Sequence, residues 1–169
     1  PVDGPVQDLA STDIRCSFNA VPINDNGILC TVLATAGIDI TFNRSGFTHS
    51  SPIFTYMAKC APDRGSFTGS VGKVWIKVHQ RGYDTVWVGQ WLHDQEYKWY
   101  TVVPACLEPR EYLVRYEVFG LSNCAKVRVC QSYPSCHQAK VLGIGTTYQN
   151  SNCLVSFPGT GYSGTKPGI

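Results

Sequence analysis

Short runs of β-branched and aromatic residues, separated by Gly, Pro, Asn and Asp, follow one another along this chain. Such runs predict β-strands joined by turns, and apolar residues at helical spacing are scarce. In the clearest run, residues 112–118, tyrosine and valine occupy one face while Leu113, Arg115 and Glu117 occupy the other. This alternation predicts a half-buried strand whose second face carries a charge pair. The expected strands are 38–42, 53–58, 74–78, 86–91, 99–103, 112–119 and 139–144.

Strands of this length and spacing predict an all-β fold, a two-sheet antiparallel β-sandwich of the immunoglobulin or fibronectin type with long loops. The chain has 169 residues, of which 43% are hydrophobic and 15% charged. This composition supplies enough apolar material for one core. Because the sequence shows neither an internal repeat nor an interdomain linker, we expect a single domain over residues 1–169.

The charge pattern narrows the class of partner. The formal net charge is +2, and lysine and arginine do not cluster, so the sequence predicts no nucleic-acid partner and no anionic membrane surface. No apolar run approaches the roughly 18 residues of a membrane-spanning helix. The chain begins at Pro1 without a leading apolar stretch, which predicts a processed or trimmed chain.

Eight cysteines are many for this length, and none stands in a C-x-x-C pair. Disulfides are therefore favoured over a paired zinc site, which predicts a secreted, extracellular protein. The triplet that begins at Asn43 is a glycosylation sequon and agrees with that location. Eight cysteines allow on the order of a hundred pairings, and spacing alone does not choose among them. Cys124 and Cys130 are able to bridge only if the residues between them turn back.

Candidate catalytic residues are few. The motifs of zinc proteases, serine hydrolases and phosphate-binding loops are absent. Asp84, Asp94 and Glu96 lie among tryptophans and tyrosines, a mixture that suits a sugar cleft with a catalytic acid pair. The stronger interpretation is that they are solvent-facing acids on strands whose aromatic residues fill the core. The histidines are His49, His79, His93 and His137, and no two have ligand spacing.

Four segments and the tail occur in the order and spacing of a known family. Residues 49–60 resemble the H-x-G-P-V-x-x-Y-M-A-K motif of fungal lytic polysaccharide monooxygenases, auxiliary-activity family nine. The other three segments resemble the family's S-x-D-I-x-C, P-G-x-Y-L-x-R-x-E and Q-x-Y-P-x-C blocks, and they are residues 11–16, 109–117 and 131–136. The tail 157–169 is similar to the family's ending. Together the matches cover roughly residues 7–169 and identify a relative of these copper-dependent enzymes.

The resemblance assigns roles to particular residues. It implies that His49 and Tyr133 are copper ligands and that Gln131 is a polar neighbour of the metal. It also implies that Tyr162 lies on a flat surface that docks on polysaccharide, cellulose or hemicellulose. Finally, it implies a Cys16–Cys136 disulfide, which closes a loop of about 120 residues and contributes about 4 to 5 kcal/mol in the chain-entropy model.

The sequence departs from the family pattern at the copper site. The family's other copper ligand is an amino-terminal histidine, whereas this sequence begins with Pro1. Ser51 replaces the motif glycine, and Ser122 aligns with a family histidine. One histidine and one tyrosine hold copper weakly, because copper selectivity needs several nitrogen ligands in a fixed geometry. The sequence therefore predicts that copper is bound weakly or not at all.

Three hypotheses follow, in order of preference. The first is a secreted carbohydrate-binding protein derived from the oxidase, with an incomplete copper site. The second is an active copper monooxygenase with a trimmed or rebuilt site around His49. The third is a glycoside hydrolase that uses Asp84 or Asp94.

Overall fold

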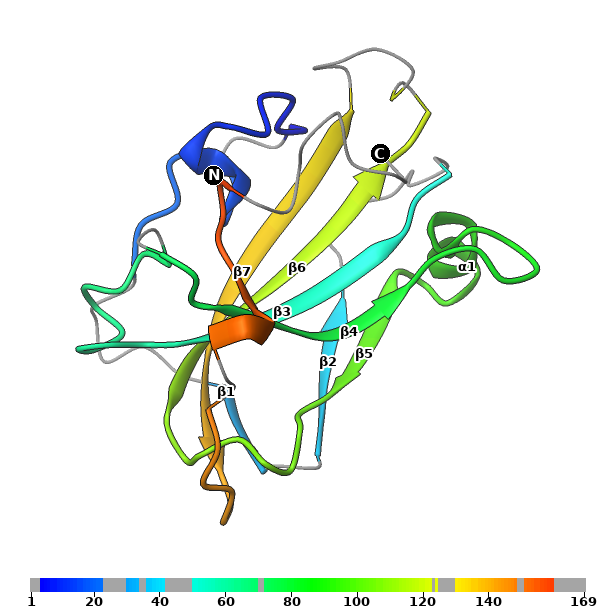
Figure 1. Ribbon diagram of the computed structural model, residues 1–169. Helices are drawn as coiled ribbons and strands as arrows, with labels where there is room; N and C mark the ends of the chain where they lie inside the picture. The colour runs from blue at the N-terminus through cyan, green and yellow to red at the C-terminus, as the bar shows by residue number, and fades with distance from the viewer. Residues whose placement is uncertain are drawn as a thin grey trace.

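The computed structural model consists mostly of β-strands in a six-stranded and a two-stranded sheet (Figure 1). It describes residues 4–22, 30–33, 36–41, 50–69, 72–122, 124, 130–148 and 151–159. The strands are β1 (Cys30–Leu33), β2 (Gly37–Thr41), β3 (Ile53–Lys59), β4 (Trp75–Arg81), β5 (Lys98–Val102), β6 (Glu111–Gly120), β7 (Gln131–Leu142) and β8 (Leu154–Val155). The helices are η1 (Thr12–Ile14), α1 (Val88–Asp94) and η2 (Ser151–Cys153). The prediction of an all-β fold is confirmed.

The large sheet has the order β1-β7-β6-β3-β4-β8, and β2 pairs with β5 in the small sheet. All these pairings are antiparallel except that of β1 with β7, which is parallel. The central strand β6 is buried from Tyr112 to Gly120. Ile53 of β3 lies opposite Val118 of β6, which lies opposite Tyr133 of β7. The beginnings of β3 and β7 and the end of β6 therefore meet at one end of the sheet.

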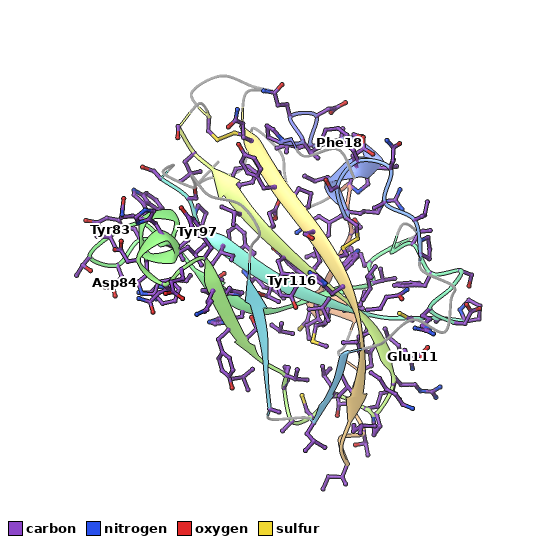
Figure 2. The ribbon with its side chains drawn as sticks, turned by 180° about the vertical axis from the view of Figure 1, so that it is seen from behind. Phe18, Tyr83, Asp84, Tyr97, Glu111 and Tyr116 are labelled. Atoms are coloured by element: carbon purple, nitrogen blue, oxygen red, sulfur yellow. A yellow bond between two sulfur atoms is a disulfide. The ribbon has the colours of Figure 1, made fainter. Side chains whose placement is uncertain are left out.

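The main core lies where β5 and α1 pack against the large sheet. Its buried residues include Met57, Leu92, Trp99, Tyr116 and Val118, from β3, α1, β5 and β6. Two hydrogen bonds connect the layers: the Trp99 indole donates to Thr55 at 3.0 Å, and the Thr55 and Thr101 hydroxyls lie 3.1 Å apart. Tyr116 sits in the middle of the sheet (Figure 2). These buried polar contacts fix how β5 lies across β3.

The expected strand 86–91 is wrong, because this segment forms α1. Its valine and tryptophan content favours a strand locally. In the fold, however, Val88 and Leu92 stand four residues apart and are both buried, which is the spacing of one helical face. Packing of this face against the main core overrides the local preference.

The second face of β6 is buried rather than solvent-exposed, which corrects the expectation of a half-buried strand. Arg115 and Glu117 do form a charge pair there, with Nη1 and Oε2 2.9 Å apart, and both side chains are completely buried. Ile14 and Phe157 cover this face in a second apolar cluster. Arg115 donates to the carbonyls of Ile14 and Arg15 at 2.7 and 2.8 Å. The amino-terminal segment thus completes the interior.

Two disulfides occur among the described cysteines. Cys16 is bridged to Cys136, with Cα atoms 5.1 Å apart, which is the pair implied by the family resemblance. Cys124 is bridged to Cys130, with Cα atoms 4.4 Å apart. Cys60, Cys106 and Cys153 are free thiols. Within the described part of the chain, none of the helices has the length and apolar character needed to cross a membrane.

Candidate functional site

Gln131 and Tyr133 stand together at the start of β7. They are two residues apart on a strand, so their side chains share one face. The Tyr133 hydroxyl donates a hydrogen bond to Oε1 of Gln131 at 3.0 Å, and both side chains are half-buried. Gly120 of β6 lies opposite Gln131, which keeps that side of the pair free of a bulky neighbour. The strand end therefore presents a phenol and an amide in a fixed arrangement.

The segment that follows His49 is held against the same end of the sheet. The amides of Leu121 and Phe119 donate to the carbonyls of Ser50 and Pro52, each at 3.0 Å. Ser51, which replaces the motif glycine, is completely buried. The fold thus brings the start of the 49–60 motif beside the end of β6, whose other neighbour is β7 with Tyr133. Two segments more than seventy residues apart in sequence, for which the resemblance predicts a common site, flank the end of β6 on opposite sides.

Three predicted site residues, His49, Asn43 and Tyr162, lie outside the described residues, and their roles stay predictions. Ser122, which aligns with a family histidine, is described and exposed.

The other three histidines have separate surroundings. His79 stacks on Trp99 with ring centroids 4.6 Å apart, and burial lowers its pKa. His93 is exposed on α1, with Nδ1 3.2 Å from Asp94. His137 lies against Tyr116, with centroids 5.6 Å apart. Among the residues that the structure describes, no three His, Cys, Asp or Glu side chains are grouped as a metal site.

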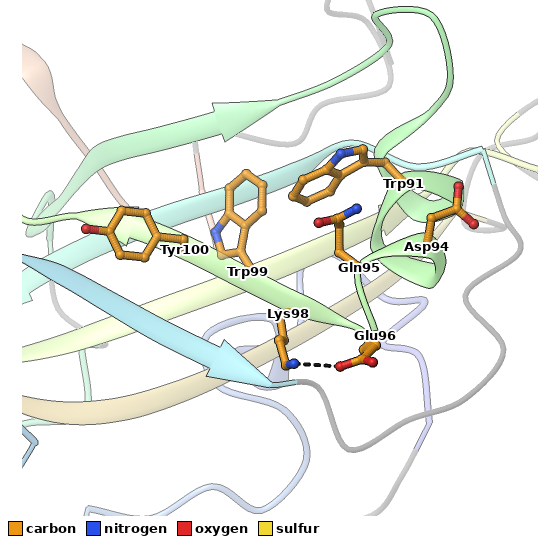
Figure 3. A pocket seen from close by; sticks show the side chains of 7 residues that line it. All are labelled: Trp91, Asp94, Gln95, Glu96, Lys98, Trp99 and Tyr100. Atoms are coloured by element: carbon orange, nitrogen blue, oxygen red, sulfur yellow. Dashed lines mark hydrogen bonds and ion pairs between the residues drawn. The ribbon is translucent and has the colours of Figure 1, made fainter.

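A second candidate site is an open hollow between α1 and β5, with a volume of about 340 Å³ (Figure 3). The side chains that line it are Trp91, Asp94, Gln95, Glu96, Lys98, Trp99 and Tyr100. The hollow therefore brings together two of the three acids that the sequence grouped with aromatic residues. Asp84 is not in its lining and lies with Tyr83 at the outer edge of the molecule (Figure 2).

The hollow does not have the acid–base features of a glycosidase. Glu96 accepts a hydrogen bond from Lys98 Nζ at 2.6 Å, and this contact lowers the pKa of Glu96. A glycosidase proton donor needs a raised pKa instead. Asp94 is exposed and lies within hydrogen-bond distance of Gln90 and His93 on its own helix. The Glu96 carboxylate is therefore better suited to accept hydrogen bonds than to donate a proton.

The sequence did not single out Arg81, Gln95 and Lys98 as parts of a site. Arg81 ends β4 and lies over the ring of Trp91, with its guanidinium carbon 4.1 Å from the ring centroid. Gln95 caps the end of α1. The one feature of the sequence that could have pointed to this site is the pair of opposite charges at Glu96 and Lys98, two residues apart. Such pairs are common on protein surfaces, so it does not identify a site.

The sequence is similar to proteins of one known family. The sequence model of Auxiliary Activity family 9, formerly GH61, matches residues 1–169. The chain is 35% identical over 180 residues to AA9 family lytic polysaccharide monooxygenase A of Gloeophyllum trabeum, with 100% of this chain and 54% of that protein aligned. It is 32% identical to monooxygenase B of the same fungus, with 100% and 69% aligned. The chain thus spans about half the length of the first of these curated relatives.

Solved structures agree with the sequence match. The fold superimposes on CvAA9A with a TM-score of 0.86 and 26% identity, covering 100% of this chain and 78% of the other. A cellulose-active polysaccharide monooxygenase from M. thermophila gives a TM-score of 0.81 at 26% identity, covering 99% and 75%.

Proposed function

The chain belongs to Auxiliary Activity family 9, and we propose that it is an extracellular protein that docks on plant-type polysaccharide, cellulose or hemicellulose. The observation that carries this proposal is the hydrogen-bonded Gln131–Tyr133 pair. The family resemblance assigns these two residues to the copper site of enzymes that act on polysaccharide, and the segment that follows His49 lies across β6 from them. The relatives' names as polysaccharide monooxygenases support the ligand class. Two disulfides support an extracellular location, because such bonds persist in oxidising compartments.

The metal that the family resemblance implies is copper. Copper in proteins prefers several imidazole nitrogens in a tetragonal arrangement. The described residues supply only the Tyr133 phenol and the Gln131 amide at this end of the sheet, while His79, His93 and His137 have the separate neighbours given above. This donor set does not fit copper by itself, so no step of the proposed function passes through the metal. We expect a protein of these 169 residues to hold copper(II) more weakly than about micromolar.

The proposal is tested by retention of the metal-free protein on microcrystalline cellulose and insoluble xylan. Tyr162→Ala weakens retention by about 1 to 3 kcal/mol if that aromatic ring is the main docking residue. Tyr83→Ala is the matched control, because Tyr83 is an exposed tyrosine in a distant part of the sequence. Wild-type protein that is retained no better than an inert protein on both materials overturns the docking proposal.

An active copper monooxygenase is the second candidate, favoured by the position of Tyr133 and the segment that follows His49 at the same end of the sheet, on either side of β6. Calorimetric titration with copper(II) separates the two. A nanomolar site that is lost in His49→Ala supports the monooxygenase. Release of oxidised oligosaccharides from cellulose, with reductant and peroxide, then decides whether that site is catalytic.

A further inference from the structure

The aromatic walls of the hollow between α1 and β5 are held rigidly from the core side. Arg81 covers one face of Trp91, and the Trp91 and Trp99 rings lie edge to face with centroids 6.2 Å apart. The Trp99 indole donates to Thr55, and its ring stacks on His79. Rings that are fixed before a ligand arrives lose little conformational freedom on binding. The hollow is therefore preorganised.

Tyr100 adds an aromatic ring that is available to a ligand. The β5 strand alternates, so that Trp99 and Thr101 point into the core and Tyr100 points outward. Tyr100 is 50% exposed. A ring in this position gains contact area when an apolar surface covers it, such as the C–H face of a sugar ring.

The polar rim is fixed by the turn between α1 and β5. Glu96 and Tyr97 have φ angles of 53° and 59°, a left-handed conformation that residues other than glycine rarely adopt. The Lys98 amide donates to the Gln95 carbonyl across this turn at 3.0 Å. The turn thus sets an amide, a carboxylate and an ammonium group around the opening (Figure 3).

The rim chemistry selects among ligand classes. An anion is repelled by the carboxylates of Asp94 and Glu96, and among the described lining residues Lys98 is the one cation. An organic cation competes with Arg81, which already covers a face of Trp91. A neutral ligand with many hydroxyl groups fits best, because the rim contains both hydrogen-bond donors and acceptors. The volume of about 340 Å³ lies at the lower end of the roughly 300–1,000 Å³ of ligand sites.

We propose that the hollow between α1 and β5 is a saccharide-binding subsite, separate from the Gln131–Tyr133 end, that holds a short segment of a neutral glycan. The proposal rests on the proposed function only for the class of ligand. Its residues are not shared with the Gln131–Tyr133 pair. Tyr100 and Trp91 contact the sugar rings, while Gln95, Asp94 and Lys98 bind their hydroxyl groups.

The test measures binding of soluble cellohexaose and xylohexaose to the metal-free protein by NMR chemical-shift titration. We expect Tyr100→Ala to raise the dissociation constant of the hexasaccharide by about tenfold, which is the effect of losing one aromatic contact. Gln95→Ala raises the dissociation constant by a smaller factor. Tyr83→Ala leaves it unchanged, because Tyr83 is 65% exposed but packs on Trp87 outside the hollow. All three side chains are exposed, so the folded spectrum is retained in each variant.

The outcomes separate this proposal from the docking proposal. Wild type that binds neither hexasaccharide, or Tyr100→Ala that binds as wild type does, overturns the subsite. Retention on cellulose that depends on Tyr162 but not on Tyr100 leaves docking intact and removes the subsite. Hexasaccharide binding that depends on Tyr100, without retention on insoluble material, supports the subsite and overturns the docking proposal. Tetramethylammonium that displaces the sugar at equal concentration assigns the hollow to cations and also overturns the proposal.

Discussion

Arg115 and Glu117 place opposite charges in the interior, two residues apart on β6. Each charge has further partners: Arg115 donates to the carbonyls of Ile14 and Arg15, and Glu117 accepts a hydrogen bond from Ser132. Removing water from two charges is costly, and their attraction offsets that cost only when such partners are in place. The pair is therefore sensitive to the loss of either member.

Glu117→Ala leaves the Arg115 guanidinium buried without its carboxylate. We expect the free energy of unfolding to fall by about 3 to 5 kcal/mol, measured by urea denaturation. The double variant Arg115→Met, Glu117→Leu is the matched control, because an apolar pair of similar volume restores most of the lost stability. A loss below about 1 kcal/mol in Glu117→Ala contradicts the interpretation.

The sequence predicted that Arg115 and Glu117 share a face of the strand, because strand side chains alternate. It did not predict that this face is covered, since the covering residue Ile14 stands 101 positions earlier in the chain. The same limit applies at the candidate site. The family resemblance grouped Gln131 with Tyr133, and only the fold showed that they share one face of a strand. Likewise, only the fold showed which of the nearby acids, Asp84 or Asp94, lines the hollow.

At the level of the elements, β7 shows why strand ends are hard to predict. The expected strand 139–144 captures only the last third of β7, because Pro134 discourages a strand assignment. In the fold, β1 pairs with β7 from Ala139 onward, so among the described strands Pro134 is paired only with β6. A proline fits at such an edge, since its missing N–H is not needed there.

The two disulfides hold elements over very different spans of sequence. Cys16–Cys136 joins the segment after η1 to β7 across 120 positions, whereas Cys124–Cys130 spans 6. In the chain-entropy model the longer loop contributes about 5 kcal/mol and the shorter about 2 kcal/mol. We therefore expect the double variant that lacks the long-range bridge (Cys16→Ala with Cys136→Ala) to lose free energy of unfolding. Its loss is expected to be more than twice that of the double variant that lacks the local bridge (Cys124→Ala with Cys130→Ala). Equal losses in guanidinium titrations of the two double variants refute this expectation.

At the scale of the whole molecule, segments near both chain ends complete a second core behind the large sheet. Val6 exchanges backbone hydrogen bonds with Ser132 at 2.7 and 3.0 Å, and Phe157 packs against Arg115, with the guanidinium carbon 4.0 Å from the ring centroid. Trp75 belongs to this second core and Trp99 to the first. The strands β3 and β6 contribute side chains to both cores, which couples them mechanically.

This coupling predicts that residues 1–169 unfold as one cooperative unit. Phe157→Ala removes a ring that contacts Tyr56 and Trp75 in the second core, at centroid distances of 5.0 and 6.0 Å, and lowers the free energy of unfolding by about 3 to 5 kcal/mol. Because the cores share two strands, far-ultraviolet circular dichroism and tryptophan fluorescence report one coincident transition in wild type and variant. Tyr83→Ala, at an exposed site, leaves the midpoint unchanged. Separate transitions in Phe157→Ala show instead that the second core melts independently, and the single-domain prediction then fails.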